Sequence, residues 1–186
     1  MIVAILGNGP SKEDWFKEKD EHPFGYVMGC NFPWTDVNGT TIIDGKAADG
    51  WIKYVIDGEA PEVKEVPLWL SPTANTRFIH AGHRDYLDKW KKGDMEVRRR
   101  ESSAHVATKV AIELLGATQV RVYGVDTFFT MQNESSTWKY VNGGLSGAKK
   151  SQQITDWRNN WHRLKEEHPH VQIIMVRLED ESSIAL

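Results

Sequence analysis

The chain has 186 residues, of which 40% are hydrophobic, and its 23 basic and 26 acidic side chains give a formal net charge of −3, which excludes a generally basic nucleic-acid binder. Eight Trp, six Phe and five Tyr supply enough apolar surface for a folded core, so disorder is not expected. Cys30 is the single cysteine and the apolar run Ile2–Leu6 is too short for a signal peptide or membrane span, so we expect a cytoplasmic protein without an internal disulfide.

Strands and helices alternate along the predicted secondary structure. Ser11, followed three residues later by Asp14, has the spacing of a capping box and predicts a helix from about Lys12. In chain order, the other expected elements are strands at Ile2–Leu6, Tyr26–Cys30 and Thr41–Ile43, a short helix at Ala47–Tyr54, a strand at Val66–Leu70, a helix at Ser103–Leu115, a strand at Val120–Tyr123, a helix at Ile154–Glu166 and a strand at Val171–Val176.

This alternation predicts one α/β domain over residues 1–186, a Rossmann-like three-layer fold with a mostly parallel sheet. Ligands of such sheets bind beyond the carboxyl ends of the strands, which directs attention to the loops after Leu6, Cys30, Ile43 and Tyr123. Residues 77–100 hold eight basic and four acidic side chains, the only net-positive stretch of the chain, so we expect a basic flap at about 72–100.

A glycine turn follows the first strand, with the sequence Gly7-Asn8-Gly9-Pro10-Ser11. Glycines allow the backbone to approach an anion, and the helix N-terminus that follows offers free N–H groups and the positive end of a dipole. The turn therefore suits a phosphate, although it matches neither the dinucleotide fingerprint nor a Walker loop. The alternative is a plain strand-to-helix turn.

Four ordered blocks of sequence carry a resemblance to a known family. They are Gly7–Ser11, Gly29–Phe32, the segment 102–117 that begins Ser-Ser-Ala-His and continues Ala-Ile-Glu-Leu-Leu-Gly, and Val122–Asp126. Together they resemble the sialyltransferase-like Rossmann superfamily, which includes bacterial lipooligosaccharide sialyltransferases, archaeal hydroxymethylpterin diphosphokinases and short phage proteins. A phage origin would place the chain in the host cytoplasm.

The resemblance implies a nucleotide site. Gly7, Asn8, Gly9 and Ser11 would hold the phosphate of a nucleotide or nucleotide sugar. Asn31 would bond its phosphate or ribose, and Ser103 would meet it through its hydroxyl and backbone N–H. Asp126 would lie at the mouth of the sheet, and Asp44 stands where the sialyltransferases have a second functional Asn.

The family's general-base histidine has no counterpart here, because residues 144–150 contain no His. Asp44 and Asp126 each follow a strand and could act as a base or hold Mg²⁺, or could instead cap a helix or turn. His105 could supply the base or be an ordinary half-buried histidine. His80 and His83 lack a third ligand at zinc spacing, so we expect no metal site there.

Aromatic and basic side chains provide further candidates. Arg98, Arg99 and Arg100 precede the Ser103 helix and could contact phosphate or DNA, or form a solvated face. Low-ranking candidates are Tyr140, Lys149 and Lys150. Trp15, Trp157 and Trp161 are expected in the core, whereas one of Trp34, Trp51 and Trp138 could stack on a base or sugar.

The function expected from these features is a small glycosyltransferase. It would use a nucleotide-sugar donor, with no tightly bound cofactor and Mg²⁺ optional. The acceptor hydroxyl could belong to a hydroxymethylated DNA base, since short phage proteins belong to the family. The alternatives are ATP-dependent diphosphate transfer to a small alcohol, with Mg²⁺ held by Asp44 and Asp126, and nucleotide binding without catalysis.

Overall fold

The computed structural model describes residues 1–56, 66–84, 97–98, 100–131 and 147–186, with side chains of the last range from residue 151 onward. Its centre is a seven-stranded sheet in the order β4-β3-β2-β1-β5-β6-β7, in which every neighbouring pair is parallel except β6 and β7. The strands are β1 (Ile2–Leu6), β2 (Phe24–Cys30), β3 (Gly39–Ile42), β4 (Leu68–Leu70), β5 (Gln119–Tyr123), β6 (Gln172–Met175) and β7 (Ile184–Ala185). The predicted α/β fold with a mostly parallel sheet is confirmed.

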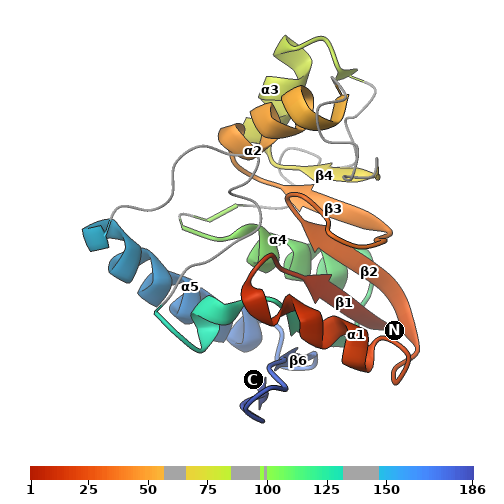
Figure 1. Cartoon of the computed structure of the whole chain (residues 1–186), viewed down its shortest axis with the longest axis vertical. Helices are drawn as coiled ribbons and strands as arrows, with labels where there is room; N and C mark the ends of the chain where they lie inside the picture. Colours follow the sequence, from red (N-terminus) through yellow and green to blue (C-terminus); the bar gives the residue numbers. More distant parts are fainter. Residues whose placement is uncertain (57–65, 85–96, 99, 132–146) are drawn as a thin grey trace.

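Helices cover both faces of this sheet (Figure 1). They are α1 (Asp14–Glu18), α2 (Gly45–Gly50), α3 (Pro72–His80), α4 (Ser103–Lys109) and α5 (Gly147–Glu167). Turns of π-helix continue α2 over Trp51–Ile56 and α4 over Val110–Leu114, and 3₁₀ turns occupy Pro10–Glu13 and Asp126–Phe128.

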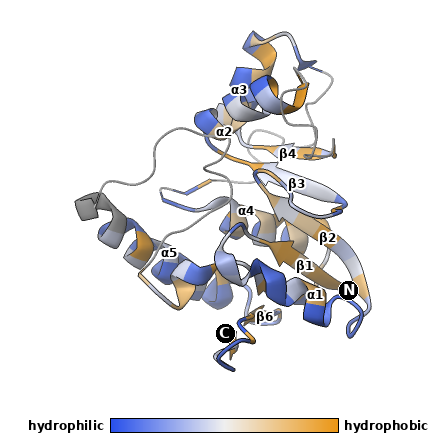
Figure 2. Ribbon diagram, viewed as in Figure 1, coloured by the Kyte–Doolittle hydropathy of each residue, from blue (hydrophilic) through white to orange (hydrophobic). Residues whose placement is uncertain are grey.

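The alternation along β1 explains the three layers. Val3 and Ile5 belong to the core beneath α4 and α5, whereas Ala4 and Leu6 pack with Trp15 of α1 on the opposite face. All four strand residues are buried, as expected for a parallel sheet covered on both sides. β1 is accordingly one of the clearly apolar parts of the ribbon in Figure 2.

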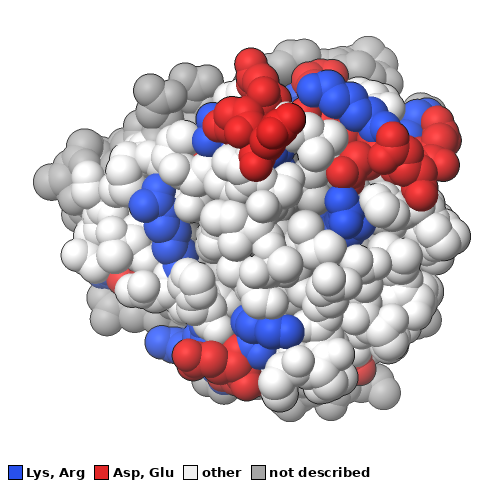
Figure 3. Space-filling model, turned by 90° about the horizontal axis from the view of Figure 1, so that it is seen from below, with Lys and Arg blue, Asp and Glu red and all other residues white. Residues whose placement is uncertain are grey.

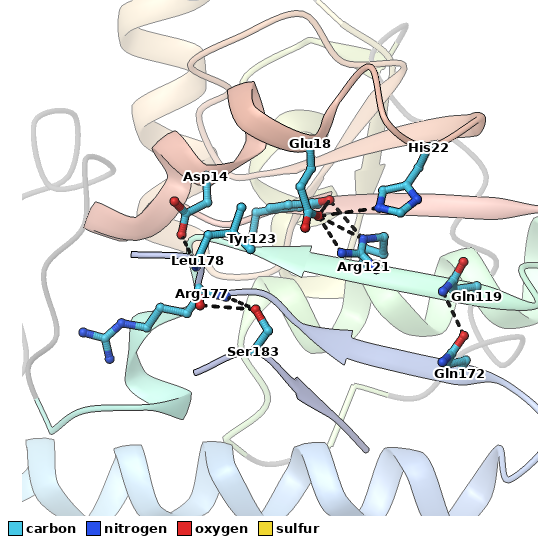
Figure 4. Close-up of polar contacts among 10 residues, drawn as sticks. All are labelled: Asp14, Glu18, His22, Gln119, Arg121, Tyr123, Gln172, Arg177, Leu178 and Ser183. Atoms are coloured by element: carbon cyan, nitrogen blue, oxygen red, sulfur yellow. Dashed lines mark hydrogen bonds and ion pairs between the residues drawn. The ribbon is translucent and has the colours of Figure 1, made fainter. Parts of the chain in front are cut away.

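A buried polar network ties α1 to β5 (Figure 4). The Glu18 carboxylate accepts hydrogen bonds from Nη2 of Arg121 at 2.6 Å and from the Tyr123 hydroxyl at 2.7 Å. Burial and the bond to Glu18 raise the pKa of Tyr123 above its ordinary value. These contacts compensate for placing a carboxylate on a face that is otherwise apolar.

Two helix starts differ from the sequence prediction. Ser11 does not cap a helix, because its side chain bonds to Asp126, and the expected capping box at Ser11 and Asp14 is wrong. The unpredicted helix α3 begins after Ser71, whose hydroxyl accepts from the Ala74 N–H at 3.1 Å, with Pro72 in the first turn. A serine followed by proline is the sequence signal for that start.

The structure describes only part of the segment 72–100, which was expected to form a basic flap. Residues 72–80 form α3, which packs through Ala74 and Phe78 on the core beside β4, and residues 85–96 lie outside the described part of the chain. Within the described residues, no helix combines the length and apolar character needed to cross a bilayer.

Candidate functional site

Strand order places a topological switch point between β1 and β5. From β1 the chain proceeds through β2 and β3 to β4 on one side, and β5 then returns to the other side of β1. Ligands of open α/β sheets bind outside the carboxyl ends of the strands near such a point. Two places at this edge contain the residues singled out in the sequence: the switch-point turn, residues 7–11, and the end of β2.

Atoms of the protein itself already accept hydrogen bonds from Gly7, Gly9 and Ser11 of the switch-point turn. The N–H groups of Gly7 and Gly9 donate to carbonyl oxygens at the end of β5, at 2.7 and 2.8 Å. Ser11 donates both its N–H and its hydroxyl to the Asp126 carboxylate, each at 3.0 Å. A carboxylate of this chain therefore takes the position that an anionic ligand would occupy beside Ser11.

The glycines of this turn are explained by the approach of another part of the backbone. A Cβ at Gly7 would lie 2.6 Å from the Gly124 carbonyl oxygen, and a Cβ at Gly9 would lie 2.7 Å from the same oxygen and collide with the Asp126 carboxylate. Phosphate binding at the turn stays a prediction, and a phosphate accepting from Ser11 would first have to displace Asp126.

The two strand-end carboxylates do not form a pair. β3 and β5 are separated by β2 and β1, so Asp44 and Asp126 follow strands that lie three strand spacings, about 14 Å, apart. This separation of the strands argues against the expectation that both carboxylates hold one Mg²⁺ ion, because two ligands of one ion lie within a few ångströms of each other. Joint Mg²⁺ binding stays a prediction. Asp44 is exposed and caps α2, accepting from the Ala47 N–H at 2.8 Å.

His105 is a structural residue inside the core. It is 1% exposed, its Nδ1 accepts from the Ser102 backbone N–H at 3.0 Å, and its Nε2 lies 2.9 Å from the Trp157 carbonyl oxygen. Burial is the main cause that lowers its pKa from 6.5 to about 3, and the Lys109 charge lowers it further. With both ring nitrogens engaged and no access to solvent, this geometry contradicts the expected role of His105 as a general base.

Asn31 and Ser103 meet directly at the carboxyl end of β2, although 72 positions separate them in the sequence. The Ser103 hydroxyl donates to Asn31 Oδ1 at 3.0 Å, and the Thr41 hydroxyl of β3 donates to the Ser103 carbonyl oxygen, also at 3.0 Å. Asn8 is buried nearby and donates from Nδ2 to the carbonyl oxygen of Cys30, which precedes Asn31. We call Asn31, Ser103 and the exposed Asp44 after β3 the Asn31 site.

The amide nitrogen of Asn31 is the open donor of this site. Among the residues that the structure describes, Asn31 Nδ2 makes no hydrogen bond, while its Oδ1 is oriented by Ser103. The residue is half-buried and has a φ of 56°. A fixed amide with two unused N–H groups can recognise an oxygen acceptor of a ligand.

The basic segment before α4 is paired with acidic side chains of α5. Arg98 forms an ion pair with Glu167 and Arg100 with Asp156. Arg99 lies outside the described residues. On the face shown in Figure 3, acidic and basic side chains of the described residues lie together at the top and bottom of the view, and a further basic group stands by itself at the left. Contacts of Arg98 and Arg100 with phosphate or DNA stay a prediction and would compete with these ion pairs.

Tryptophans divide into core and edge positions. Trp15 and Trp161 are buried as predicted, Trp157 is half-buried, and Trp51, expected near the ligand, is instead fully buried. Trp34 is half-buried and covers the switch-point turn, donating from Nε1 to the Gly7 carbonyl oxygen at 3.0 Å. The structure does not describe Trp138, Tyr140 or the side chains of Lys149 and Lys150.

One group of metal-ligating side chains was not anticipated from the sequence. Glu18, Glu21 and His22 place their ligand atoms within 4.8 Å of one another. Glu18 is the last residue of α1 and the other two lie in the turn that follows it, so the sequence signal that could have found them is their spacing of three and four positions. Glu18 already accepts from Arg121 and Tyr123, so its contacts are explained by the packing of α1 on β5.

The Asn31 site therefore combines an oriented amide after β2, a hydroxyl at the start of α4 and an exposed carboxylate in the loop after β3. β2 and β3 are neighbouring parallel strands, so the residues that follow them lie at the same edge of the sheet. Comparisons of the chain with protein-family models, with curated proteins and with solved structures found no match.

Proposed function

We propose that the protein binds a nucleotide or nucleotide sugar at the Asn31 site and is a small transferase that moves the glycosyl group to an acceptor hydroxyl. The observation that carries the proposal is the Asn31–Ser103 hydrogen bond, which joins the end of β2 to the start of α4. Among the residues that the structure describes, it leaves Asn31 Nδ2 without a hydrogen-bond partner, so this donor is available to a ligand. These are two of the residues that the family resemblance assigns to the nucleotide.

Recognition of the nucleotide rests on neutral donors. Asn31 Nδ2 can donate to a phosphate or ribose oxygen, and the first N–H groups of α4 have no acceptor within their own helix. The start of α4 also carries the positive end of the helix dipole. An anionic phosphate beside Ser103 would thus find hydrogen-bond donors and a favourable field without a dedicated cation.

Asp44 is the base that the geometry favours. His105 is buried in the core and Asp126 is bonded to Ser11, whereas Asp44 is exposed in the loop that follows β3, the strand next to β2. In the proposed step the acceptor oxygen loses its proton to the Asp44 carboxylate and forms a bond to the anomeric carbon. The bond from that carbon to the donor phosphate breaks, and the phosphate leaves with the electron pair, stabilised by the donors of Asn31 and α4.

A second candidate function is nucleotide binding without catalysis. It is favoured by the observation that all three expected base residues already accept hydrogen bonds from the protein itself: His105 from Ser102, Asp126 from Ser11, and Asp44 from Ala47. Diphosphate transfer has less support, since its Mg²⁺ was to be shared by Asp44 and Asp126, which follow well-separated strands. A hydroxymethylated DNA base as acceptor stays a prediction.

Calorimetric titration of the purified protein with CMP, UMP, GMP and AMP, and with UDP-glucose, tests the binding proposal. For any nucleotide that binds, Asn31→Ala should weaken the affinity by about tenfold or more, as expected for the loss of one or two hydrogen bonds to a charged group. Asn159→Ala, on the exposed face of α5, is the matched control. Equal affinities for the three proteins would refute the Asn31 site.

Turnover separates the two candidate functions. With a donor and acceptor identified, Asp44→Asn should lower kcat by about 10²-fold, the usual loss when a general base is removed, while nucleotide affinity changes less. The amide oxygen retains the cap on Ala47, so the fold should tolerate this change. Tight nucleotide binding with no transfer to any tested acceptor and no donor hydrolysis would favour the non-catalytic function.

A further inference from the structure

The backbone of Asn31 has an unusual conformation for a residue with a side chain. Its φ of 56° lies in the left-handed region, which costs free energy for residues other than glycine and which asparagine tolerates better than most. Among the described residues, two other non-glycine residues, Arg100 and Glu181, have positive φ, and neither lies at the ends of β2 and β3. Such a conformation persists only where the surroundings hold it.

Three hydrogen bonds hold the two ends of the Asn31 residue. Its N–H donates to the Thr41 carbonyl oxygen at 2.9 Å. Its carbonyl oxygen accepts from the Thr40 hydroxyl at 3.2 Å and from Nε1 of Trp51 at 2.9 Å. Both donors to the carbonyl are side chains, so their effect can be tested by substitution without altering the backbone.

Trp51 is rigidly placed for this contact. It is 0% exposed, and its ring stacks on Phe32 with centroids 5.7 Å apart and an angle of 12° between the planes. Its position follows from α2, which starts at the Asp44 cap and leads directly into Trp51. The single donor of the indole is therefore directed at Asn31 by the burial of Trp51 and its stacking on Phe32.

We propose that Trp51, assisted by Thr40, is a positioning residue that holds Asn31 in the left-handed conformation and so presents Asn31 Nδ2 to the ligand. The inference rests on the proposed function for the identity of the ligand, whereas the role of Trp51 in holding the backbone of Asn31 can be tested without any ligand. It also connects the site's parts: Asp44 begins the helix whose end supplies Trp51, so one short segment orients both the carboxylate and the amide.

The test combines a ligand-free readout with binding. Trp51→Phe retains an aromatic ring against Phe32 and removes the N–H donor. In NMR spectra of the unliganded full chain, wild-type Asn31 should show the strong intraresidue HN–Hα NOE of a positive φ, and Trp51→Phe should weaken it. Thr40→Val, which removes the hydroxyl donor, should also weaken this NOE. Thr40→Ser keeps the hydroxyl and should show the NOE at its wild-type strength.

Trp161→Phe is the matched control, because it truncates another buried tryptophan that contacts His105 rather than Asn31. For a nucleotide that wild type binds, Trp51→Phe should lower the affinity by about tenfold and Trp161→Phe should leave it unchanged. A Trp51→Phe protein that keeps both the NOE and the affinity would overturn the inference. Should wild type bind none of the nucleotides, the proposed function fails, while the NOE still decides whether Trp51 positions Asn31.

Discussion

The switch-point turn and the Asn31 site lie at the same edge of one sheet and follow adjacent strands, yet they differ in what their polar groups contact. At the switch-point turn, the N–H groups of Gly7, Gly9 and Ser11 all donate to atoms of the segment that ends β5. At the Asn31 site, Asn31 Nδ2 has no partner among the described residues. The first place is closed by the protein itself, and the second retains donors for a ligand.

This difference shows that a glycine-rich turn at a helix start does not identify an anion site without knowledge of what lies opposite. Gly7 and Gly9 permit a close approach, and here the approaching group is the backbone of Gly124 with the carboxylate of Asp126. The same physical property, absence of a Cβ, would serve a phosphate equally well. The partner is decided by the strand order that puts β5 beside β1.

The largest expected effect on stability comes from adding a side-chain atom where the switch-point turn contacts the segment after β5. Gly7→Ala would put a Cβ 2.6 Å from the Gly124 carbonyl oxygen, and we expect the free energy of unfolding to fall by about 3 kcal/mol in urea denaturation. Gly25→Ala is the control, since its Cβ would meet mainly the flexible side chain of Met1. Wild-type stability of Gly7→Ala would show that the turn is loose enough to admit a ligand.

His105, the third residue of α4, is buried, and its titration gives a test of how α4 is packed in the core. Because burial lowers its folded pKa from 6.5 to about 3, the unfolded chain takes up a proton below pH 6.5 that the folded chain refuses. The contribution of His105 to the free energy of unfolding is therefore fully present above pH 6.5 and is lost as the pH is lowered. At pH 5 this loss makes the free energy of unfolding about 2 kcal/mol smaller than at neutral pH.

His105→Gln lacks this titration, so the stability gap between wild type and variant should narrow by about 2 kcal/mol between pH 7.5 and pH 5. Urea denaturation at the two pH values measures the gap, and comparing the proteins cancels the contribution of other groups. Nucleotide affinity should stay the same, because Ser103 and not His105 contacts Asn31. A gap independent of pH would mean that His105 protonates readily in the folded state.

Asp126→Asn tests whether Asp126 only stabilises the switch-point turn by accepting hydrogen bonds from Ser11 or also acts as a catalytic base. The change weakens the hydrogen bonds from Ser11, and we expect a loss of about 1 kcal/mol in stability with nucleotide affinity within twofold of wild type. Thermal unfolding and calorimetry provide the two numbers. A large gain in affinity would reveal a phosphate that competes with the carboxylate, and a 10²-fold loss of turnover at full stability would make Asp126 the base.

The smallest effects are expected from the basic segment. Arg98→Ala and Arg100→Ala each remove a partly exposed ion pair with α5, which contributes at most about 1 kcal/mol. If both arginines keep their ion pairs with α5 when a nucleotide binds, nucleotide affinity and its dependence on salt should be unchanged in the variants. A flatter salt dependence in either variant would show that the arginine leaves its α5 partner to contact phosphate.

Much of the fold could be predicted because its signals are local. Buried runs such as Ile2–Leu6 and the helical spacing within Ser103–Leu115 report which residues must leave water, and the observed β1 and α4 follow them. Helix α3 was missed, although Ser71 and Pro72 mark its start. Asn31 and Ser103, which the resemblance assigns to one nucleotide, contact each other, and their binding of a nucleotide stays a prediction. Asp44 and Asp126, expected as a pair, follow strands that are separated by β2 and β1.

By itself, the sequence determined the parallel α/β class and the turn and strand-end positions where a site could form, since these depend on hydrophobic period and on residues with special backbone freedom. Only the tertiary structure decided which donors were consumed. Asp126 reaches Ser11 because β5 lies beside β1, and Trp51 reaches Asn31 because α2 packs beside β3. The physical reason is that hydrogen-bond satisfaction is a property of neighbours in space, and these neighbours are 115 and 20 positions apart in the chain.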